Sequence, residues 1–580
     1  MEKKQIIKEF TEEEYEEFFC WLFDKDSIEL DKEVDISKCI EYQKPYIYYT
    51  PEIKEFFETK PMKRLGRIGQ LANCLFNNPN SSHTRLDHCK GAYQKMLEFY
   101  MLQYQKLEWR ENNSSEESKL KVLADMMDMA SHDIGHNVCS HALEELIGTG
   151  KGAHEVLGNR ILHENEDAVK AFNNIHPKLL QSLDIVKQEN YNLHSLKEGS
   201  IDFDRADFLI RDSLYLGIEN GVPSVKEYPR TIAQLLDTIM NGCEIYKINR
   251  DGKDMKVPVF SYEVEPEIEE FLERRVENYE NVYCSKINRP YDILLLEYCK
   301  YLIKSNEENC ELKTFLNHIA DNKIEDIDLN EFLEWDDIRF FNSVFDLSIN
   351  SKNKDLRNFS KLCLPKLDSL VSLVYNRLMP SVIPEIDENG NEIELENEFE
   401  LQEDRKFYLN VRKLVKNPSY YSEIFEKNKS NEVITSMVFD SIDEQEKLKK
   451  QLEEGIVISE TETISLSKDI IEKLEFWNYK IKKYNKNEPI FIKDSENKIY
   501  TLDEYPERHL DITPKEQCGI ILIESRLIEK GVEPSDIEKC RTLFNKIKQN
   551  NLKNVLNTES TRLNSELIDL KFKMIEADEK

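Results

Sequence analysis

Three separated segments of this 580-residue chain carry side chains of the types that bind metal ions. They are Arg85-x-x-His88, His132-Asp133 with His136 close behind, and Asp202-x-Asp204. Imidazole and carboxylate groups together suit manganese, iron, zinc or nickel, whereas a site made only of oxygen ligands would suit magnesium or calcium. Such a site leaves positions for water and for substrate oxygens. The chemistry indicated is metal-dependent hydrolysis of a phosphate ester.

The middle segment, residues 126–146, reads MMDMASHDIGHNVCSHALEEL. Apolar residues recur there at helical intervals, which predicts a helix. Adjacent residues such as His132 and Asp133 point about 100° apart on a helix, so both can bind one ion without clashing. His88 precedes this segment and Asp204 follows it. We therefore predict a metal site formed by His88, His132, Asp133 and Asp204.

A single histidine on an apolar helix is more often a buried core residue than a metal ligand. The joint occurrence of the HDxGH cluster, Arg85 and the later DxD pair favours the functional interpretation. For six other histidines we expect structural roles: His83, His163, His176, His194, His318 and His509.

Around these residues the chain resembles the HD superfamily. Within it, the chain is similar to deoxynucleoside triphosphate triphosphohydrolases of the sterile-alpha-motif/HD type and to their bacterial dGTPase relatives. The motifs that carry the resemblance are RLGRIGQL (64–71), RLDH (85–88), HDIGHNVCSH (132–141) and DFDRADFLIRD (202–212). The segment RRVENYENVYCSK (274–286) resembles a family helix that presents an arginine, a tyrosine and a lysine to the nucleotide. The resemblance covers about residues 45–310.

The resemblance implies a mainly α fold, an HD-domain helical core with small β-hairpin additions. It also implies hydrolysis of a deoxynucleoside triphosphate (dNTP) to deoxynucleoside and inorganic triphosphate. Each active site would hold one divalent metal (Mn, Fe, Mg, Zn or Ni), and Mn or Mg is expected to support activity in an assay. The catalytic group would be His141, Glu144, His154 and His136, with His141 protonating the leaving 5′ oxygen.

The substrate-binding residues implied by the resemblance are Gln70, Arg85, Arg205, Phe208, Asp212, Arg275, Tyr283 and Lys286. Gln70 and Asp212 would bond the sugar 3′-hydroxyl, above the ring of Phe208. Cationic groups, together with His136, would neutralise the triphosphate. The chain departs from the family pattern at Glu144, Arg205 and Phe208, where aspartate, lysine and tyrosine are usual. It also has Gly66 where the animal enzymes use an arginine for an activating nucleotide.

Composition limits the possible partners. A formal net charge of −33 opposes a large nucleic-acid surface, because polyanions are bound mainly through phosphate neutralisation, so duplex nucleic acid is not expected. The 40% hydrophobic content indicates a globular chain, and the twelve cysteines form no C-x-x-C pair. No apolar run approaches the roughly 20 residues of a membrane span, and the charged N-terminus is unlike a secretory signal. We expect no membrane association and a cytoplasmic protein.

We expect four regions along the chain: an N-terminal docking segment (1–45), the HD catalytic core (46–310), a helical region with an acidic loop (311–405) and a mixed, mostly helical C-terminal α+β region (406–580). Turn residues between β-rich stretches predict hairpins at residues 244–264 and 489–505. The acidic stretch at 388–405 indicates a solvated loop or edge hairpin. The final segment predicts an amphipathic helix with Leu563, Leu567, Leu570 and Met574 on one face.

Two other functions remain open at this point. An HD-type phosphodiesterase of cyclic or linear oligonucleotides would use two metals, with His136, His141 and His154 available as additional ligands. A non-catalytic nucleotide-sensing protein would bind without turnover. The resemblance alone also implies a homo-oligomer and possible regulatory nucleotides.

Overall fold

The computed structural model of the chain describes residues 10–35, 46–76, 78–147, 152–188, 201–216, 231–250, 253–283, 288–365, 367–374, 377, 401–417, 435–439, 442–459, 462–481, 489–506, 515–522, 527–528 and 530–552. The chain forms two compact units. The first unit comprises Met1–Asn428 and Tyr479–Lys515, and the second comprises Lys429–Asn478 and Glu516–Lys580. The division into four regions stays a prediction.

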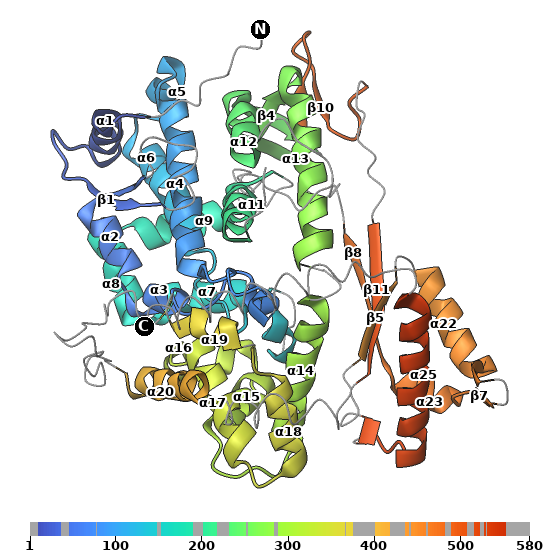
Figure 1. Ribbon diagram of the computed structural model, residues 1–580. Coiled ribbons are helices and arrows are strands. Elements are labelled where there is room, and N and C mark those ends of the chain that lie inside the picture. The colour runs from blue at the N-terminus through green and yellow to red at the C-terminus, as the bar shows by residue number, and fades with distance from the viewer. Residues whose placement is uncertain are drawn as a thin grey trace, which may run out of the picture. The chain divides into compact units, whose positions relative to one another are not determined.

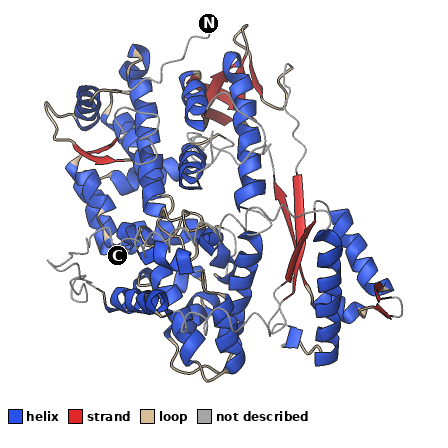
Figure 2. Cartoon of the chain, in the orientation of Figure 1, coloured by secondary structure: helices blue, strands red, loops and turns tan. Residues whose placement is uncertain are grey.

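Helices dominate the first unit, as Figures 1 and 2 show, which confirms the mainly α fold. At its centre α4 (Arg85–Tyr104) packs against α6 (Glu116–Ser131) and α11 (Phe203–Leu216). The other helices before residue 310 are α2 (Pro51–Phe57), α3 (Lys60–Leu65), η2 (Ala72–Phe76), α5 (Leu107–Asn112), η3 (Ser140–Leu146), α7 (Ala153–Glu164), α8 (Glu166–Ile175), α9 (Leu179–Gln188), α12 (Ile232–Asn241), η5 (Tyr262–Val264), α13 (Glu265–Asn278), η6 (Tyr279–Tyr283) and α14 (Asn288–Lys304).

The helical region after α14 packs as a continuation of the same unit. Its α17 (Asp337–Asn350) contacts α15, α18 and α20, and α14 contacts α15 and α18. The bounds of these elements are α15 (Glu311–Asp321), η7 (Ile324–Asp326), α16 (Leu329–Leu333), α18 (Lys354–Leu362), α19 (Leu367–Leu373) and α20 (Gln402–Lys416).

The N-terminal segment contains an amphipathic helix, α1 (Glu12–Phe23), which begins at a Thr11–Glu14 capping box. Its apolar side chains pack toward α4 and α6, and the Tyr15 ring stacks on Tyr48 with centroids 4.0 Å apart. The short strands β1 (Asp31–Val34) and β2 (Tyr46–Tyr49) pair antiparallel beside it.

Both predicted hairpins form, and they join in one sheet. Strands β3 (Cys243–Arg250) and β4 (Lys253–Ser261) pair antiparallel, as do β9 (Phe491–Lys493) and β10 (Ile499–Thr501). Strand β4 also pairs with β9 in parallel, giving the order β10-β9-β4-β3. A chain separation of more than 200 residues between β4 and β9 explains why local patterns predicted the hairpins but not their union.

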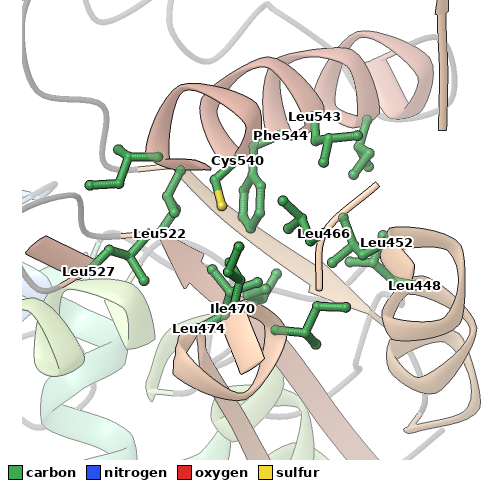
Figure 3. Close-up of a cluster of buried hydrophobic side chains, with 14 of the residues drawn as sticks. Leu448, Leu452, Leu466, Ile470, Leu474, Leu522, Leu527, Cys540, Leu543 and Phe544 are labelled. Carbon is green, nitrogen blue, oxygen red and sulfur yellow. The ribbon is translucent and has the colours of Figure 1, made fainter. Parts of the chain in front are cut away.

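The second unit is a three-stranded sheet with helices, in the order β5 (Thr435–Phe439), β11 (Lys515–Leu522) and β8 (Glu475–Ile481). Figure 3 shows its apolar core, in which Leu448 and Leu452 approach Leu543 and Phe544. Its remaining elements are α22 (Ile442–Glu454), β6 (Ile456–Ser459), β7 (Glu462–Ile464), α23 (Lys468–Lys473) and α25 (Pro534–Leu552). The expectation of a mixed C-terminal region is met by these helices and strands.

The helix predicted across residues 126–146 is interrupted, which corrects the sequence analysis. Helix α6 ends at Ser131, His132 is its C-cap, and residues 132–135 form a turn. Cys139 and Ser140 have φ values of 55° and 51°, in the left-handed region that a continuing α-helix excludes. His132 and Asp133 are therefore placed by a helix end and a turn rather than by helical spacing.

Some predictions fall outside the described residues: those on Lys286, His194, His509, residues 388–400 of the acidic stretch, and Leu563, Leu567, Leu570 and Met574 of the final helix. Cysteines within the described ranges carry free thiols. Among the helices of those ranges, none combines the length and the apolar character needed to cross a bilayer.

Candidate active site

The ends of three packed helices bring the predicted metal ligands together. Helix α4 begins at the Thr84 capping box, which places His88 in its first turns. Helix α6 ends beside His132, and Asp204 is the second residue of α11. Figure 1 shows the central α4 to which both other helices pack.

Three of the four predicted ligands converge at one point, and Asp133 lies beside them. His88 Nε2 lies 3.0 Å from Asp204 Oδ1 and 3.1 Å from His132 Nε2. His132 Nε2 lies 3.4 Å from Asp133 Oδ1 and 3.7 Å from Asp204 Oδ1. His88, His132 and Asp204 together offer ligand atoms that lie within 4.8 Å of one another. This is the type of mixed nitrogen and oxygen donor set that transition-metal ions prefer.

The outer hydrogen bonds of both imidazoles turn their Nε2 atoms toward the cluster. His132 Nδ1 lies 2.7 Å from the Met129 carbonyl oxygen, which only accepts, and His88 Nδ1 lies 2.9 Å from Asp207 Oδ2. Neutral rings with Nδ1–H bonded outward present lone pairs at Nε2. Two such lone pairs facing each other at 3.1 Å are stabilised by a cation, so the residues fit a metal ion.

Charge in the cluster supports the same conclusion. Burial disfavours a charged His88, yet the hydrogen bonds to Asp204 and Asp207 outweigh burial and raise its pKa to about 10. Burial would also raise the pKa of Asp204, but His132 and His88 lower it well below the usual carboxyl range. The raised pKa of His88 beside an ionised Asp204 shows that this cluster favours positive charge. A divalent metal would compete with protons for these groups.

Arg85 orients the Asp133 carboxylate. Its Nη1 donates to Asp133 Oδ2, and its Nε donates to Ser140 Oγ at 2.9 Å. The Arg85 side chain is 5% exposed. The phosphate-binding role expected for Arg85 stays a prediction, since in this arrangement its guanidinium is already bonded to Asp133 and to the HDxGH loop.

A second histidine cluster lies on the other side of Asp133. His136 Nε2 is 3.1 Å from Asp133 Oδ1, and its ring stacks on His154 with centroids 4.2 Å apart. The His141 ring meets His136 edge-on at 4.7 Å. Burial and the neighbouring Arg85 lower the pKa of His136 well below its ordinary value, which favours a neutral ring. His136, His141 and His154 also offer atoms within 4.8 Å of one another.

Glu144 holds two of these histidines. His141 Nδ1 lies 3.0 Å from Glu144 Oε2, and His154 Nδ1 lies 2.6 Å from Oε1. Burial alone would raise the pKa of Glu144, but these hydrogen bonds lower it well below the usual range, so it is ionised. The His141 side chain is 61% exposed. An exposed imidazole anchored at Nδ1 is suited to exchange a proton through Nε2.

The residues expected to contact the sugar form a second group next to the metal ligands. The Tyr283 hydroxyl donates to Asp212 Oδ2 at 2.6 Å. The Phe208 ring lies between the two groups, with its centroid 5.8 Å from that of Tyr283 and 6.3 Å from that of His88. Burial and Asp212 raise the pKa of Tyr283 well above its ordinary value, so its hydroxyl keeps the proton.

The remaining predicted cations lie around α11 and α13. Arg205 pairs with Asp202, and its backbone N–H also donates to Asp202 Oδ1 at 2.6 Å. Burial of Asp202 raises its pKa to about 8. The charges of Arg205 and of the buried Arg275 act in the opposite direction but are outweighed. These observations place Arg205 and Arg275 near the N-terminal end of α11. Their contact with phosphate stays a prediction.

Comparison with known proteins gives partial matches. A protein of Acanthamoeba polyphaga mimivirus named for an HD domain is 26% identical over 191 residues, which are 30% of this chain and 42% of that protein. The chain is similar to HD-domain proteins. The Deoxynucleoside triphosphate triphosphohydrolase SAMHD1 homolog of Dictyostelium discoideum is 27% identical over 180 residues, 28% of this chain and 34% of that protein.

The match covers about half, or less, of the length of these relatives. An uncharacterized protein of Mycoplasma pneumoniae is 28% identical over 243 residues, 40% of this chain and 51% of that protein. No family model matches the chain. Among solved structures, a phosphohydrolase from Bacteroides thetaiotaomicron has a TM-score of 0.53 at 17% identity, covering 85% of this chain and 99% of that chain. The mainly α fold is therefore similar to that of a solved phosphohydrolase.

Three residues that the sequence did not assign to the candidate site contact its members. Asp207 bonds the predicted metal ligand His88. His83, expected to have only a structural role, lies 2.6 Å from Asp212. Asp337 accepts from the amides of Gly69 and Cys139, which flank the predicted site residues. Asp207 follows Asp204 by three residues on one helix, a spacing that could have indicated it. His83 and Asp337 carry no comparable local signal.

Proposed function

We propose that this chain is a metal-dependent phosphohydrolase of the HD type that hydrolyses dNTPs to deoxynucleoside and inorganic triphosphate. The observation that carries the proposal is the convergence of His88, His132 and Asp204, with Asp133 beside them, from three separate helix ends. Two further observations support the proposal. They are the neighbouring Asp212–Tyr283 pair and the similarity to a relative named a triphosphohydrolase.

The metal would be held by His88, His132, Asp133 and Asp204. It would supply Lewis-acid activation of a phosphate oxygen and of water. Arg85 keeps the Asp133 carboxylate turned toward this point through a direct ion pair. Asp207 keeps His88 in the tautomer whose Nε2 faces the cluster.

The chain's own acid would be His141. Glu144 accepts hydrogen bonds from the Nδ1 atoms of His141 and His154, which leaves the Nε2 atom of His141 available. A protonated His141 would donate its Nε2 proton to the 5′ oxygen as the bond to the α-phosphorus breaks. His154 and the neutral His136 pack on His141 and restrict its rotation.

Substrate class would be set by two groups. Asp212, beside Tyr283 and near the Phe208 face, would receive the sugar hydroxyl. Arg205 and Arg275, with Lys286 outside the described residues, would neutralise the triphosphate. A local cationic surface is needed because the chain as a whole carries a net charge of −33.

Product analysis tests the proposal. The purified protein is incubated with each dNTP, each ribonucleoside triphosphate and all four dNTPs together, with Mn²⁺ or Mg²⁺. Deoxynucleoside with intact triphosphate is the expected result. Formation of only mono- or diphosphates, or no product under any of these conditions, would contradict it.

The matched control is a pair of histidine variants. His132→Ala removes a ligand from the cluster and should abolish product. His318→Ala removes a histidine whose ring bonds Asn322 and the Asp328 amide and lies 3.7 Å from Glu331, and it should leave activity unchanged. Equal activity in both variants would show that the product comes from a contaminant.

The second histidine cluster favours one other candidate, an HD-type phosphodiesterase with two metals. His136, His141 and His154 could hold a second ion, and Asp133 lies between the clusters, 3.4 Å from His132 Nε2 and 3.1 Å from His136 Nε2. Elemental analysis distinguishes the candidates. One metal per chain with triphosphate release supports the first proposal, and two metals with cleavage of a cyclic or linear oligonucleotide support the second.

A homo-oligomer and regulation by nucleotides are proposals that rest on the resemblance. A cytoplasmic location is a proposal that rests on the charge and hydropathy pattern of the sequence. Hyperbolic kinetics with every dNTP singly and in pairs would oppose nucleotide regulation. Tight dNTP binding with no turnover under any metal would instead support a nucleotide-sensing role.

A further inference from the structure

The Asp212 carboxylate is held from two directions. His83 Nε2 lies 2.6 Å from Asp212 Oδ1, and the Tyr283 hydroxyl donates to Asp212 Oδ2. The side chains of His83 and Asp212 are 0% and 3% exposed. A carboxylate has about four lone-pair positions, so these two bonds fix its orientation and still allow it to accept from a ligand.

The His83 ring is itself fixed. It stacks on Tyr215, with ring centroids 4.5 Å apart and an interplanar angle of 26°. A carboxylate oxygen accepts, so His83 Nε2 carries the hydrogen that is directed at Asp212. The other nitrogen, Nδ1, is buried and has no hydrogen-bond partner among the described residues. Within those residues, the hydrogen bond made by this imidazole is the one to Asp212.

Gln70 is adjacent through the backbone. Its amide nitrogen donates to the His83 carbonyl oxygen at 3.1 Å. The Gln70 side-chain oxygen is buried and, in the part of the chain that the structure describes, has no partner. A ligand hydroxyl has one hydrogen, which it can donate to a free lone pair of the fixed Asp212 carboxylate. The buried Gln70 oxygen is a second acceptor, and a buried acceptor without a partner costs free energy that a ligand donor would recover.

We propose that His83 is a positioning residue that orients Asp212 to receive the nucleotide's 3′-hydroxyl, and that it thereby selects nucleotides with this group over 3′-deoxy analogues. The inference rests on the proposed dNTP hydrolysis. His83 would touch Asp212 rather than the substrate, so it is not a catalytic residue. Its loss should reduce turnover only of substrates that carry the 3′-hydroxyl.

The experiment compares kcat/KM for a dNTP and for the matching 2′,3′-dideoxynucleotide, which has the same scissile bond. His83→Leu removes the hydrogen-bond donor, His83→Gln retains one, and His163→Leu is a control at a histidine that is 31% exposed and pairs with Asp184. In His83→Leu we expect a loss of about 10- to 100-fold for the dNTP, as for a hydrogen bond to a charged group, with little change for the dideoxynucleotide. His83→Gln should restore part of the preference.

The outcomes separate the inference from the function on which it rests. If the wild type hydrolyses dNTPs and His83→Leu loses both substrates equally, His83 is merely structural and the inference is wrong. If the wild type hydrolyses both substrates equally well, the 3′-hydroxyl is not recognised and the inference is again wrong, while the proposed function stands. No turnover of either nucleotide overturns both. If His83→Leu does not fold, the same ratio measured in His83→Gln and Tyr283→Phe decides, because each alters one bond to Asp212.

Discussion

The Asp337 carboxylate accepts a hydrogen bond from the backbone amide of Cys139, 198 residues earlier in the chain, at 2.7 Å. The same carboxylate accepts from the amide of Gly69 at 2.8 Å and pairs with Arg377 at 3.0 Å. Cys139 precedes the Ser140–His141 pair, and Gly69 precedes Gln70. A residue of the later helical region thus ties together two loops of the candidate site.

Asp337→Asn should destabilise the fold and lower turnover. The substitution removes the negative charge that pairs with the buried Arg377. It also places an amide NH₂ group beside the N–H donors of Gly69 and Cys139. Breaking a buried ion pair from one side costs about 3–5 kcal/mol. We expect a loss of about 3 kcal/mol in the free energy of unfolding by urea, and a lower kcat at temperatures where the variant is folded.

Glu334→Gln is the matched control for that prediction. Glu334 lies three residues before Asp337 in the sequence and pairs with Lys60. Both side chains of this pair are more than half exposed. Exposed pairs contribute about 0–1 kcal/mol, so this variant should keep nearly all its stability. Equal effects of the two variants would show that the Asp337 contacts do not hold the loops.

Asp207→Asn should weaken metal binding without abolishing it. Asp207 Oδ2 bonds His88 Nδ1, and loss of a partner of this kind usually costs about 10- to 100-fold in metal affinity. Mn²⁺ titration by calorimetry measures the change, with Asp204→Asn expected to bind no metal at this site. Asp184→Asn, on the partly exposed His163 pair, serves as control. Unchanged affinity in Asp207→Asn would contradict the proposed orientation of His88.

Gly135→Ala should displace helix α7 and with it His154. A Cβ at Gly135 would collide with the His154 carbonyl oxygen and the Gly158 amide. Overpacking of this kind costs about 1–3 kcal/mol or more. Thermal unfolding and kcat should both fall.

Gly158→Ala tests the same contact from the opposite side. Its Cβ would meet Ile134 Cγ2 at 3.3 Å, and alanine is a better helix former than glycine. This variant should be nearly neutral in thermal unfolding. A larger effect in Gly158→Ala than in Gly135→Ala would mean that the loop carrying Gly135 can move to accommodate a side chain, whereas helix α7 does not have to move.

Glu144→Gln should remove a pH-dependent part of the stability. Burial raises the pKa of Glu144, but the hydrogen bonds and charges of His141 and His154 lower it by more than burial raises it. The pKa of Glu144 is therefore lower in the folded than in the unfolded state. The ionised carboxylate therefore stabilises the fold above the ordinary pKa of about 4.3, and this contribution is lost as pH falls through the folded pKa. The wild type should exceed Glu144→Gln in free energy of unfolding at pH 7, with the difference shrinking below about pH 4.

Urea unfolding across this pH range makes the measurement. Glu155→Gln, at an exposed position on α7, should show no such difference. A difference between wild type and Glu144→Gln that stays constant into acid would indicate that the hydrogen bonds, not the charge, matter. The same variant should lower kcat by about 100-fold, as for loss of general acid catalysis, with its metal content unchanged.

The sequence by itself determined the elements and the donor types. The Thr11 and Thr84 caps, the apolar stripe of α1 and the turn residues of both hairpins act between residues a few positions apart. The HDxGH motif likewise identified the imidazole and carboxylate groups, although it did not indicate that the helix ends beside them. Such local signals do not depend on the rest of the chain, so they could be predicted.

Tertiary structure decided which of these groups meet. Helix α6 ends at Ser131 because Gly135 packs directly on the backbone of α7, and the next residues adopt a turn. His83 finds Asp212 across 129 residues, and Asp337 finds Cys139 across 198. These contacts arise from packing of distant segments, which leaves no periodic or turn signal in the sequence around either partner.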